Sequence, residues 1–131
     1  RFVAAVKGAA MEKGIVNVSS GAGKDAIDAW GSYCVTKAGL DMFSESINVE
    51  QGVGVEYPVK VLSVAPGIVD TDMQSDIRAS NPEDFSRHAE FTGFKNEGAL
   101  VSPKAVAEKY LYILNNLEKF DETLYSLRDL D

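Results

Sequence analysis

The sequence predicts an α/β fold built on a parallel sheet, and two observations carry this prediction. Short apolar segments typical of buried strands alternate along the 131 residues with longer segments of helical periodicity. Each link between consecutive strands is long enough for a right-handed crossover through a helix. Ligands of such sheets bind at the carboxyl ends of the strands, and Ser20 and Pro66-Gly67 occupy two of those ends.

The amino-acid composition indicates what kind of protein this is. Apolar residues make up 45% and charged residues 25% of the chain, as in a soluble globular protein, so we expect residues 1–131 to form a single partial domain. The net charge of −7 disfavours nucleic acid and anionic membranes as partners. No apolar run approaches a membrane span and no signal-peptide pattern is present. The single cysteine, Cys34, fits a reducing cytoplasm, and we expect it to be a small buried side chain and expect no metal site.

The first elements follow from periodicity and helix stop signals. Residues 1–13 are typical of the tail of a helix, with apolar residues at helical spacing and Gly14 placed to stop it. This segment has neither a capping residue nor an initiator Met, so we expect more polypeptide before it. Ile15 to Ser19 is a short, mostly apolar segment, as expected of a parallel strand covered on both faces.

A loop and a long helix come next. The loop, Gly21 to Ala29, contains glycines but lacks the spacing of a phosphate-binding turn. The helix is predicted over Ser32 to Glu50, with an acidic, solvated side and a buried apolar face. The solvated side comprises Asp41, Glu45 and Glu50, and the apolar face comprises Val35, Leu40, Phe43 and Ile47.

The second strand is predicted over Val59 to Val64, after a turn rich in glycine, and Pro66-Gly67 ends it because proline cannot donate to the ladder. A short helix is expected over Thr71 to Arg78. Residues Asn81 to Gly98 are polar with recurring Glu and Phe, and we expect them to form a mobile flap over the site. His88, within the flap, is expected to be a solvated surface residue.

The last helix is opened by Ser102 as cap and Pro103 in the first turn. Thr123 to Leu127 is the predicted final strand, and residues 128–131 form a tail. The buried stripe of the last helix is expected to comprise Val106, Tyr110, Ile113, Leu114 and Leu117.

The residues best suited to catalysis are Tyr33, Lys37 and Ser20. Tyr33 and Lys37 are four positions apart on the predicted helix and share one face, where a lysine ammonium favours the phenolate. Ser20 ends the first strand, from which a loop returns to the start of that helix. Two hydroxyls and one cation suit a carbonyl that must be polarised and protonated. The alternative is that both residues are only structural, with the tyrosine at the edge of the core and the lysine extended to solvent.

The motifs around these residues point to a known family. Gly14 to Gly21 (GIVNVSSG) and Ala65 to Thr71 (APGIVDT), together with the Tyr-Lys pair, resemble the short-chain dehydrogenase/reductase family. Trp30 to Cys34 (WGSYC) and Val69 to Gln74 (VDTDMQ) resemble its sepiapterin reductase and bacterial benzil reductase branch. The resemblance covers nearly the whole chain. It implies the C-terminal, catalytic half of a doubly wound, Rossmann-like parallel sheet, with about three parallel strands and flanking helices.

The resemblance also implies an activity, that of an NAD(P)-dependent carbonyl oxidoreductase. Tyr33 matches the general acid that protonates the carbonyl oxygen, and it also contacts the cofactor. Lys37 matches the residue that binds the nicotinamide ribose and favours the phenolate. Ser20 matches the hydroxyl that orients and polarises the carbonyl. Fixed donors aimed at an oxygen that gains negative charge stabilise the transition state.

The same family pattern assigns the remaining candidates. The cofactor is expected to be NADP, with NAD possible, because the residues that select between them would precede this chain. Asp70 and Asp72 are interpreted as residues that begin a helix. The loop matching the nicotinamide-binding segment comprises Pro66, Gly67, Ile68, Val69 and Thr71, and the expected substrate pocket comprises Ser20, Gly21, Trp30, Met73 and Gln74.

The substrate and the assembly are further expectations. Sepiapterin reductases carry an Asp in the last strand where this chain has Ser126, with Asp129 nearby. Of the two kinds of substrate in this branch, a benzil-like ketone or diketone is therefore favoured over a pteridine-like one. The family also implies a homodimer or homotetramer. Because the dinucleotide-binding half is absent from these residues, we expect the fragment alone to be inactive. The alternative hypothesis is a non-catalytic α/β scaffold that retains the fold.

Overall fold

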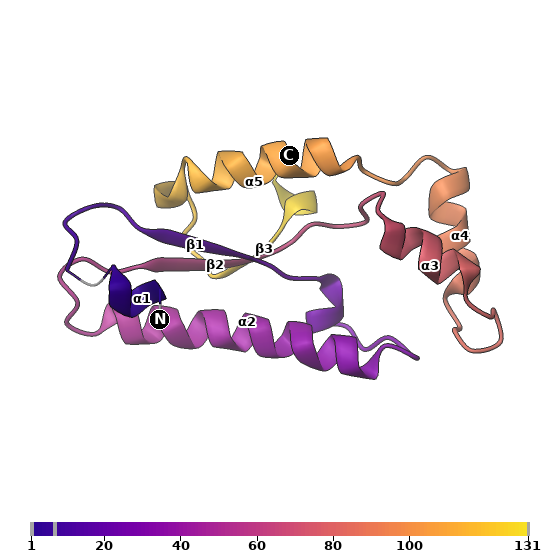
Figure 1. The fold of residues 1–131 in the computed structure, drawn as a ribbon, viewed down its shortest axis with the longest axis horizontal. Coiled ribbons are helices and arrows are strands. Elements are labelled where there is room, and N and C mark those ends of the chain that lie inside the picture. Colours follow the sequence, from indigo (N-terminus) through magenta and orange to yellow (C-terminus); the bar gives the residue numbers. More distant parts are fainter. Residues whose placement is uncertain (1, 7, 131) are drawn as a thin grey trace.

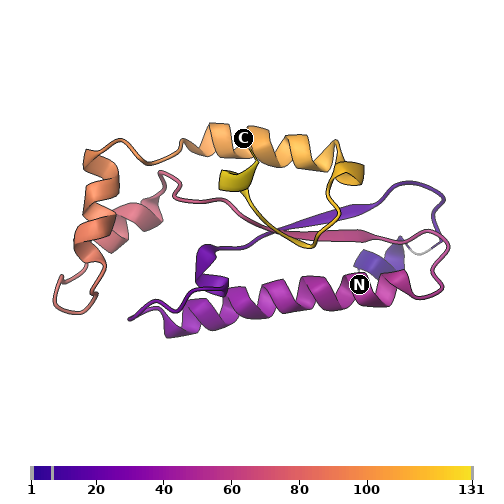
Figure 2. The same cartoon turned by 180° about the vertical axis from the view of Figure 1, so that it is seen from behind.

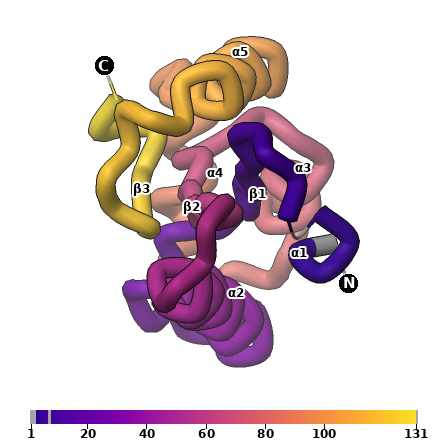
Figure 3. Tube along the Cα trace, turned by 90° about the vertical axis from the view of Figure 1, so that its left-hand side faces the viewer, coloured from indigo at the N-terminus to yellow at the C-terminus, as the bar shows by residue number. Residues whose placement is uncertain are grey.

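Three layers make up the main body of the molecule. The structure, a computed structural model, describes residues 2–6 and 8–130. A parallel sheet in the order β1-β2-β3 separates helix α2 (Gly31–Gly52) from helix α5 (Pro103–Leu114), as Figures 1 and 3 show. The expected α/β class and its three parallel strands are therefore confirmed. In the described part of the chain, no helix combines the length and apolar character needed to cross a membrane.

The three strands lie within one or two residues of their predicted positions. Strand β1 (Gly14–Val18) pairs along its whole length with β2 (Lys60–Ala65), and the short β3 (Leu124–Ser126) pairs with the end of β2. Leu62 and Val64 of β2 are fully buried. The central strand is covered on both faces, and for this reason its sequence is almost continuously apolar.

Helix α5 packs on one face of the sheet through the main hydrophobic core. Ser102 caps the helix by accepting a hydrogen bond from the Ala105 N–H at 3.2 Å, as expected. Leu117 lies beyond the helix, in the 3-10 turn Leu117–Lys119, and Leu114 is exposed rather than buried because the helix ends there. The buried core comprises Leu62, Val64, Val106, Ile113, Leu117, Phe120 and Leu127.

Helix α2 forms where it was predicted, and Glu50 is exposed as expected, but the expected orientation is wrong for three other residues of its faces. Val35 and Phe43 are 72% and 58% exposed, whereas Asp41 is only 7% exposed. The reason is that the surface of the sheet under α2 presents polar groups, which need polar partners from the helix. Those partners are Lys37, Asp41, Ser44, Asn48 and Gln51.

Asn48 shows why this helix face is polar. Its side-chain amide donates to the Val61 carbonyl at 2.6 Å and accepts from the Val61 N–H at 2.9 Å. Strand β3 pairs with β2 only from Ser63 onward, so the peptide groups of Val61 lack a strand partner on that side. The asparagine side chain satisfies them instead, as buried backbone groups require.

The N-terminal segment and Cys34 differ from the expectations. Helix α1 spans only Phe2–Ala5, and the chain then turns through Gly8, whose φ of +81° is accessible mainly to glycine. The expected helix over residues 1–13 is therefore wrong beyond Ala5, and its residues 1 and 7 lie outside the described part. Cys34 is half-buried rather than buried, with its Sγ 3.9 Å from the Asp25 carbonyl oxygen.

Two further helices, α3 (Asp72–Ala79) and α4 (His88–Asn96), extend beyond one end of the sheet, as Figures 1 and 2 show. Phe85 and Phe91 are buried against Ile77 in a second hydrophobic cluster, so the segment expected to be a flap contains a packed helix. His88 is half-buried, with its Nε2 3.1 Å from the Arg78 carbonyl oxygen. The expectation of a solvated histidine is therefore wrong.

Candidate functional site

The first turns of α2 bring Lys37 against the ring of Tyr33. The Lys37 ammonium lies 5.6 Å from the centroid of the Tyr33 ring. The same Nζ donates a hydrogen bond of 2.9 Å to the carbonyl oxygen of Val18, the last residue of β1. One turn of helix sets the spacing of the two side chains, and the strand end holds the ammonium beside the phenol. Together they form a polar pair at the carboxyl end of the sheet.

Ser20 follows β1 directly and faces the same region. Its hydroxyl oxygen accepts a hydrogen bond of 3.2 Å from the Ala22 N–H, which caps the 3-10 turn Gly21–Gly23. A serine hydroxyl that accepts one bond can still donate its own hydrogen. Ser20 and Tyr33 line two cavities in common, so the structure brings these two sequence-predicted hydroxyls to one place.

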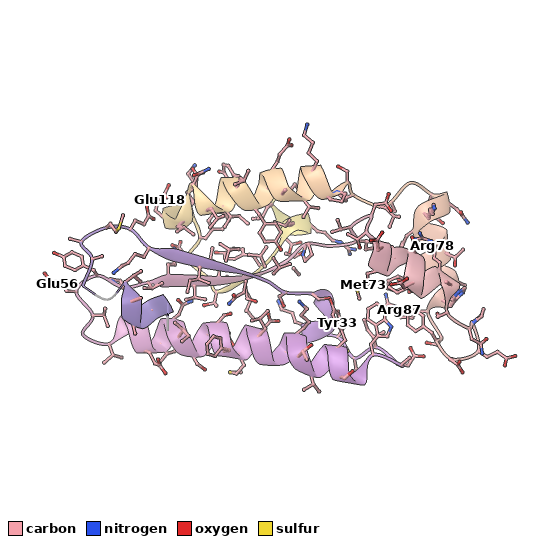
Figure 4. All side chains as sticks on the ribbon, in the orientation of Figure 1. Tyr33, Glu56, Met73, Arg78, Arg87 and Glu118 are labelled. Carbon is pink, nitrogen blue, oxygen red and sulfur yellow. The ribbon has the colours of Figure 1, made fainter. Side chains whose placement is uncertain are left out.

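The two cavities meet along a shared wall. Their volumes are about 700 and 650 Å³. Figure 4 shows Tyr33, Met73 and Arg87 at the same end of the molecule. Tyr33 and Met73 belong to the shared wall, and Arg87 lines the larger cavity. The residues that line both cavities are Ser19, Ser20, Tyr33, Gly67, Met73 and Gln74.

The larger cavity has an aromatic side built around Trp30. Trp30 packs edge-on against Tyr33, with ring centroids 5.6 Å apart, and stacks on Phe85 at 5.4 Å. Phe91 lies 5.3 Å from Trp30 and, with Phe94, also lines the cavity. Trp30 and Gly21 were expected here, whereas the phenylalanines were missed. Their recurrence between residues 81 and 98 was the available signal.

The smaller cavity is bounded by the loop after β2 and by α5. Pro66, Gly67, Val69 and Thr71 line it, whereas Ile68 lines the larger cavity instead. Gly67 has a φ of +80°, and a Cβ there would lie 3.2 Å from Nε of Arg128. The loop thus forms one wall of a mainly apolar cavity, and at Gly67 the neighbouring Arg128 leaves little room for a side chain.

The loop is held in place by a neighbouring segment. The Val101 N–H donates to the Ile68 carbonyl and the Asp70 N–H donates to the Val101 carbonyl, both at 2.9 Å. Thr71 precedes α3 as its N-cap residue, and its side chain makes no capping bond. The Thr71 side chain is exposed, so its hydroxyl is accessible to a bound molecule.

Gln74 carries a buried polar atom that the described residues leave unsatisfied. Its side chain is 7% exposed, and its Oε1 has no hydrogen-bond partner in the described part of the chain. A buried amide oxygen without a partner costs about 1–3 kcal/mol. Because Gln74 lines both cavities, this oxygen is suited to a donor on a bound molecule. No cluster of three metal-ligating side chains occurs among the residues described.

Tyr110 closes the smaller cavity on the α5 side. Its hydroxyl donates a hydrogen bond of 2.7 Å to the Val64 carbonyl oxygen. Burial raises the pKa of Tyr110 to about 12, so its phenol stays protonated at neutral pH. Through this hydrogen bond Tyr110 fixes α5 to the end of β2.

Asp28 connects the loop before α2 to the segment before α4. The Ser86 backbone N–H and hydroxyl both donate to its carboxylate at 2.8 Å. The backbone hydrogen bond from Ser86, with that of the hydroxyl, lowers the pKa of Asp28 below its ordinary value of 3.8. The contact thus holds the aromatic side of the larger cavity against the start of α2.

Acidification is expected to release this contact. The pKa of Asp28 is lower in the folded state than in the unfolded state. The contact therefore stabilises the fold fully at a pH above the unfolded-state pKa, and this stabilisation is lost as the pH falls through the folded-state pKa. The chemical shift of the Ser86 amide, followed by NMR from pH 7 downward, should therefore change in the acidic range below about pH 4. In Asp28→Asn the Ser86 shift should already be displaced at pH 7 and should not titrate. Identical titrations in both proteins would contradict the assignment.

Comparison with known proteins finds a matching family model and several similar proteins. A family model described as short chain dehydrogenase matches residues 4–82. Over 108 residues the chain is 45% identical to the benzil reductase ((S)-benzoin forming) of Bacillus cereus, an alignment that covers 82% of this chain and 43% of the relative. It is 36% identical over 104 residues to the sepiapterin reductase of Meriones unguiculatus, covering 79% of this chain and 37% of that protein.

A solved structure agrees with these matches. The crystal structure of the KRED1-Pglu enzyme superposes with a TM-score of 0.66 at 33% sequence identity, covering 76% of this chain and 40% of that chain. A similarity of this size at this identity indicates the same arrangement of strands and helices. The chain spans about two fifths of the length of the relatives it matches.

Proposed function

Because the chain belongs to the short-chain dehydrogenase family, we propose that it is the catalytic half of an NAD(P)H-dependent carbonyl reductase. The observation that carries the proposal is the convergence of Ser20, Tyr33 and Lys37 at the carboxyl end of the sheet. The similarity to benzil and sepiapterin reductases supports the same reaction class.

The proposed roles follow from the positions of the three side chains. Tyr33 donates its phenolic proton to the carbonyl oxygen of the substrate, and Ser20 donates a hydrogen bond to that oxygen. The Lys37 ammonium, near the Tyr33 ring, stabilises the phenolate left after proton transfer. A bound reduced nicotinamide would supply the two electrons as hydride. Donors fixed in advance around the oxygen stabilise the charge that develops there.

The smaller cavity is the proposed site of the nicotinamide end of the cofactor. The loop Pro66, Gly67, Val69 and Thr71 would hold the carboxamide through backbone groups and the Thr71 hydroxyl. Lys37 does not line this cavity, but its ammonium lies beside Tyr33, which does, and from there it would bind the ribose. Ile68 would contribute its backbone to the same loop. The mainly apolar lining from α5 excludes water from the ring face. We propose NADP as the cofactor, with NAD as the alternative.

The larger cavity is the proposed substrate pocket. Its aromatic side at Trp30 and Phe91 suits a substrate with an aromatic ring, since aromatic pairs add stabilisation beyond area burial. Gln74, which lines this cavity, would donate a hydrogen bond from its side-chain Nε2 to a second oxygen beside the reacting carbonyl. Ser126 lines the cavity where a pteridine-anchoring aspartate would be expected. We therefore propose an aromatic ketone or vicinal diketone, with a pteridine as the runner-up.

Turnover by the full-length protein that contains this chain tests the proposal. NADPH oxidation should be observed with benzil, and it should be slower with deoxybenzoin, which keeps both rings but lacks the second carbonyl. Loss of NADPH absorbance measures both rates, and NADH in place of NADPH tests the cofactor. A full-length protein that binds NADPH but reduces no carbonyl in a broad panel would refute the proposed reaction.

We also propose that the full-length protein is a homodimer or homotetramer. The outer face of α2 is apolar and exposed, including Met42 (62%), Phe43 (58%) and Val49 (69%), and such faces mark association sites. Met42→Glu should therefore reduce the mass measured by light scattering, while Glu50→Gln should leave it unchanged. A wild-type monomer at micromolar concentration would contradict the proposal. The single cysteine supports a reducing, cytoplasmic location.

A further inference from the structure

We propose that Asp41 is a positioning residue of this site, because its buried carboxylate fixes the segment bearing Ser20 to the helix bearing Tyr33 and Lys37. The effect on catalysis that we infer for Asp41 rests on the proposed function. It concerns a residue that the sequence pattern assigned to the solvated side of the helix.

The contacts of Asp41 show a buried, shared acceptor. Its Oδ1 accepts a hydrogen bond from the Ser19 hydroxyl at 2.5 Å and a second from the Ser63 hydroxyl at 2.7 Å. All three residues are buried, with exposures of 7%, 4% and 1%. Short hydrogen bonds from hydroxyls to a carboxylate are about twice as strong as neutral ones. One carboxylate oxygen therefore connects α2 to β2 and to the residue just after β1.

The position of Asp41 relates these contacts to the candidate catalytic groups. It follows Lys37 by one helical turn and Tyr33 by two, on the same face of α2. Ser19, which it binds, is the immediate neighbour of Ser20. The carboxylate thus sets the distance between the two parts of the chain that carry the proton donor and the polarising hydroxyl.

Gly23 provides an independent contact on the other side of Ser20. A Cβ at this glycine would lie 2.6 Å from Oδ2 of Asp41 and 3.1 Å from the backbone carbonyl carbon of Lys37. The 3-10 turn after Ser20 therefore packs directly on the carboxylate, and only glycine fits there. Asp41 consequently restrains Ser20 from both neighbouring segments, through Ser19 before it and through Gly23 after it.

Another polar contact of α2 offers a matched control. Ser44 is fully buried and accepts a hydrogen bond of 2.9 Å from the Asn17 side chain, which also connects α2 to β1. This contact lies one turn farther from Tyr33 and does not touch the Ser20 segment. If α2 only needs to be held on the sheet, loss of either contact should have the same consequences. If Asp41 positions Ser20, only its loss should affect catalysis.

The kinetic test compares Asp41→Ala with Ser44→Ala in the full-length protein. Asp41→Ala should lower kcat for the diketone about a hundredfold, because small displacements of catalytic groups have effects of this size, while KM changes little. Ser44→Ala should lower the melting temperature but leave kcat within a factor of about three. Asp41→Asn keeps an acceptor oxygen for the two serines and should recover most of kcat. Equal kcat losses in Asp41→Ala and Ser44→Ala would overturn the proposal.

A second measurement does not depend on activity or on a large core change. Ser19→Ala and Ser63→Ala each remove one hydroxyl from Asp41, and only Ser19 adjoins Ser20. Amide hydrogen exchange at residues 20–24 should therefore accelerate more in Ser19→Ala than in Ser63→Ala, and Gly23→Ala should accelerate it as well. Equal exchange in the two serine variants would overturn the proposal even in an inactive protein. A wild-type protein without turnover would count against the proposed function alone.

Discussion

Replacing Tyr33 with phenylalanine is expected to lower kcat of the full-length protein by about 10²- to 10⁴-fold, the contribution usual for a general acid. The substitution removes only the hydroxyl. The ring contacts of Tyr33, at 5.6 Å from Trp30 and 5.6 Å from the Lys37 ammonium, are retained. The melting temperature should therefore stay close to that of the wild type while proton delivery to the substrate oxygen is lost. NADPH oxidation and thermal unfolding, measured on the same samples, separate the two effects.

Tyr110→Phe is the matched control for this experiment. It also removes a phenolic hydroxyl from the lining of the smaller cavity, but that hydroxyl is bonded to the Val64 carbonyl oxygen. Its loss should reduce the free energy of unfolding by about 1 kcal/mol and leave kcat nearly unchanged. Full activity in Tyr33→Phe would remove the proposed acid and would favour the alternative of a non-catalytic scaffold, for which both tyrosines are packing residues.

The arrangement of strands and the position of the main site could be predicted from sequence because both depend on local patterns. A parallel strand covered on both faces, such as β2, must be a short apolar run whatever its partners. A loop after the end of such a strand lies at the ligand-binding edge by topology alone. Ser20, Tyr33 and Gly67 were therefore expected near one another, and they line the same two cavities.

The faces of α2 could not be predicted in the same way. Its helical periodicity is clear, but the hydrophobic pattern indicates only which face is apolar, not what that face contacts. The sheet under α2 offers Ser19, Ser63 and the peptide groups of Val61, so the polar face of the helix packs inward. Asp41 is buried as a consequence. This outcome depends on tertiary partners far away in the sequence, which no local pattern contains.

The aromatic side of the larger cavity was missed for a related reason. Phe85 and Phe91 belong to a segment whose polar composition is typical of a loop, yet both are buried against Ile77 and Trp30. Their burial depends on α3 and α4 packing together beyond the end of the sheet. In the folded chain, these two rings lie against Trp30, which itself contacts Tyr33, although they are far from both residues in the sequence. Sequence identified Trp30 there but not the rings around it.

The 131-residue chain on its own is expected to bind NADPH at least about a thousandfold more weakly than the full-length protein, a difference of about 4 kcal/mol. Within the described residues β1 pairs only with β2, so its other edge has backbone groups without a strand partner. Val18, at the end of that edge strand, is 53% exposed. The described residues include the contacts that we propose for the nicotinamide and its ribose, but the sequence contains no glycine-rich dinucleotide turn for the pyrophosphate.

Calorimetric titration of NADPH into each purified protein measures this difference, and light scattering on the same samples reports association. We expect the isolated chain to associate, because an unpaired strand edge and the apolar outer face of α2 are both open to other copies. Intact mass establishes that the sample is the 14.2 kDa chain itself. A soluble monomer of that mass that binds NADPH at micromolar concentration would show that these residues contain the whole cofactor site. That result would contradict our proposal that this chain supplies only the nicotinamide end of the site.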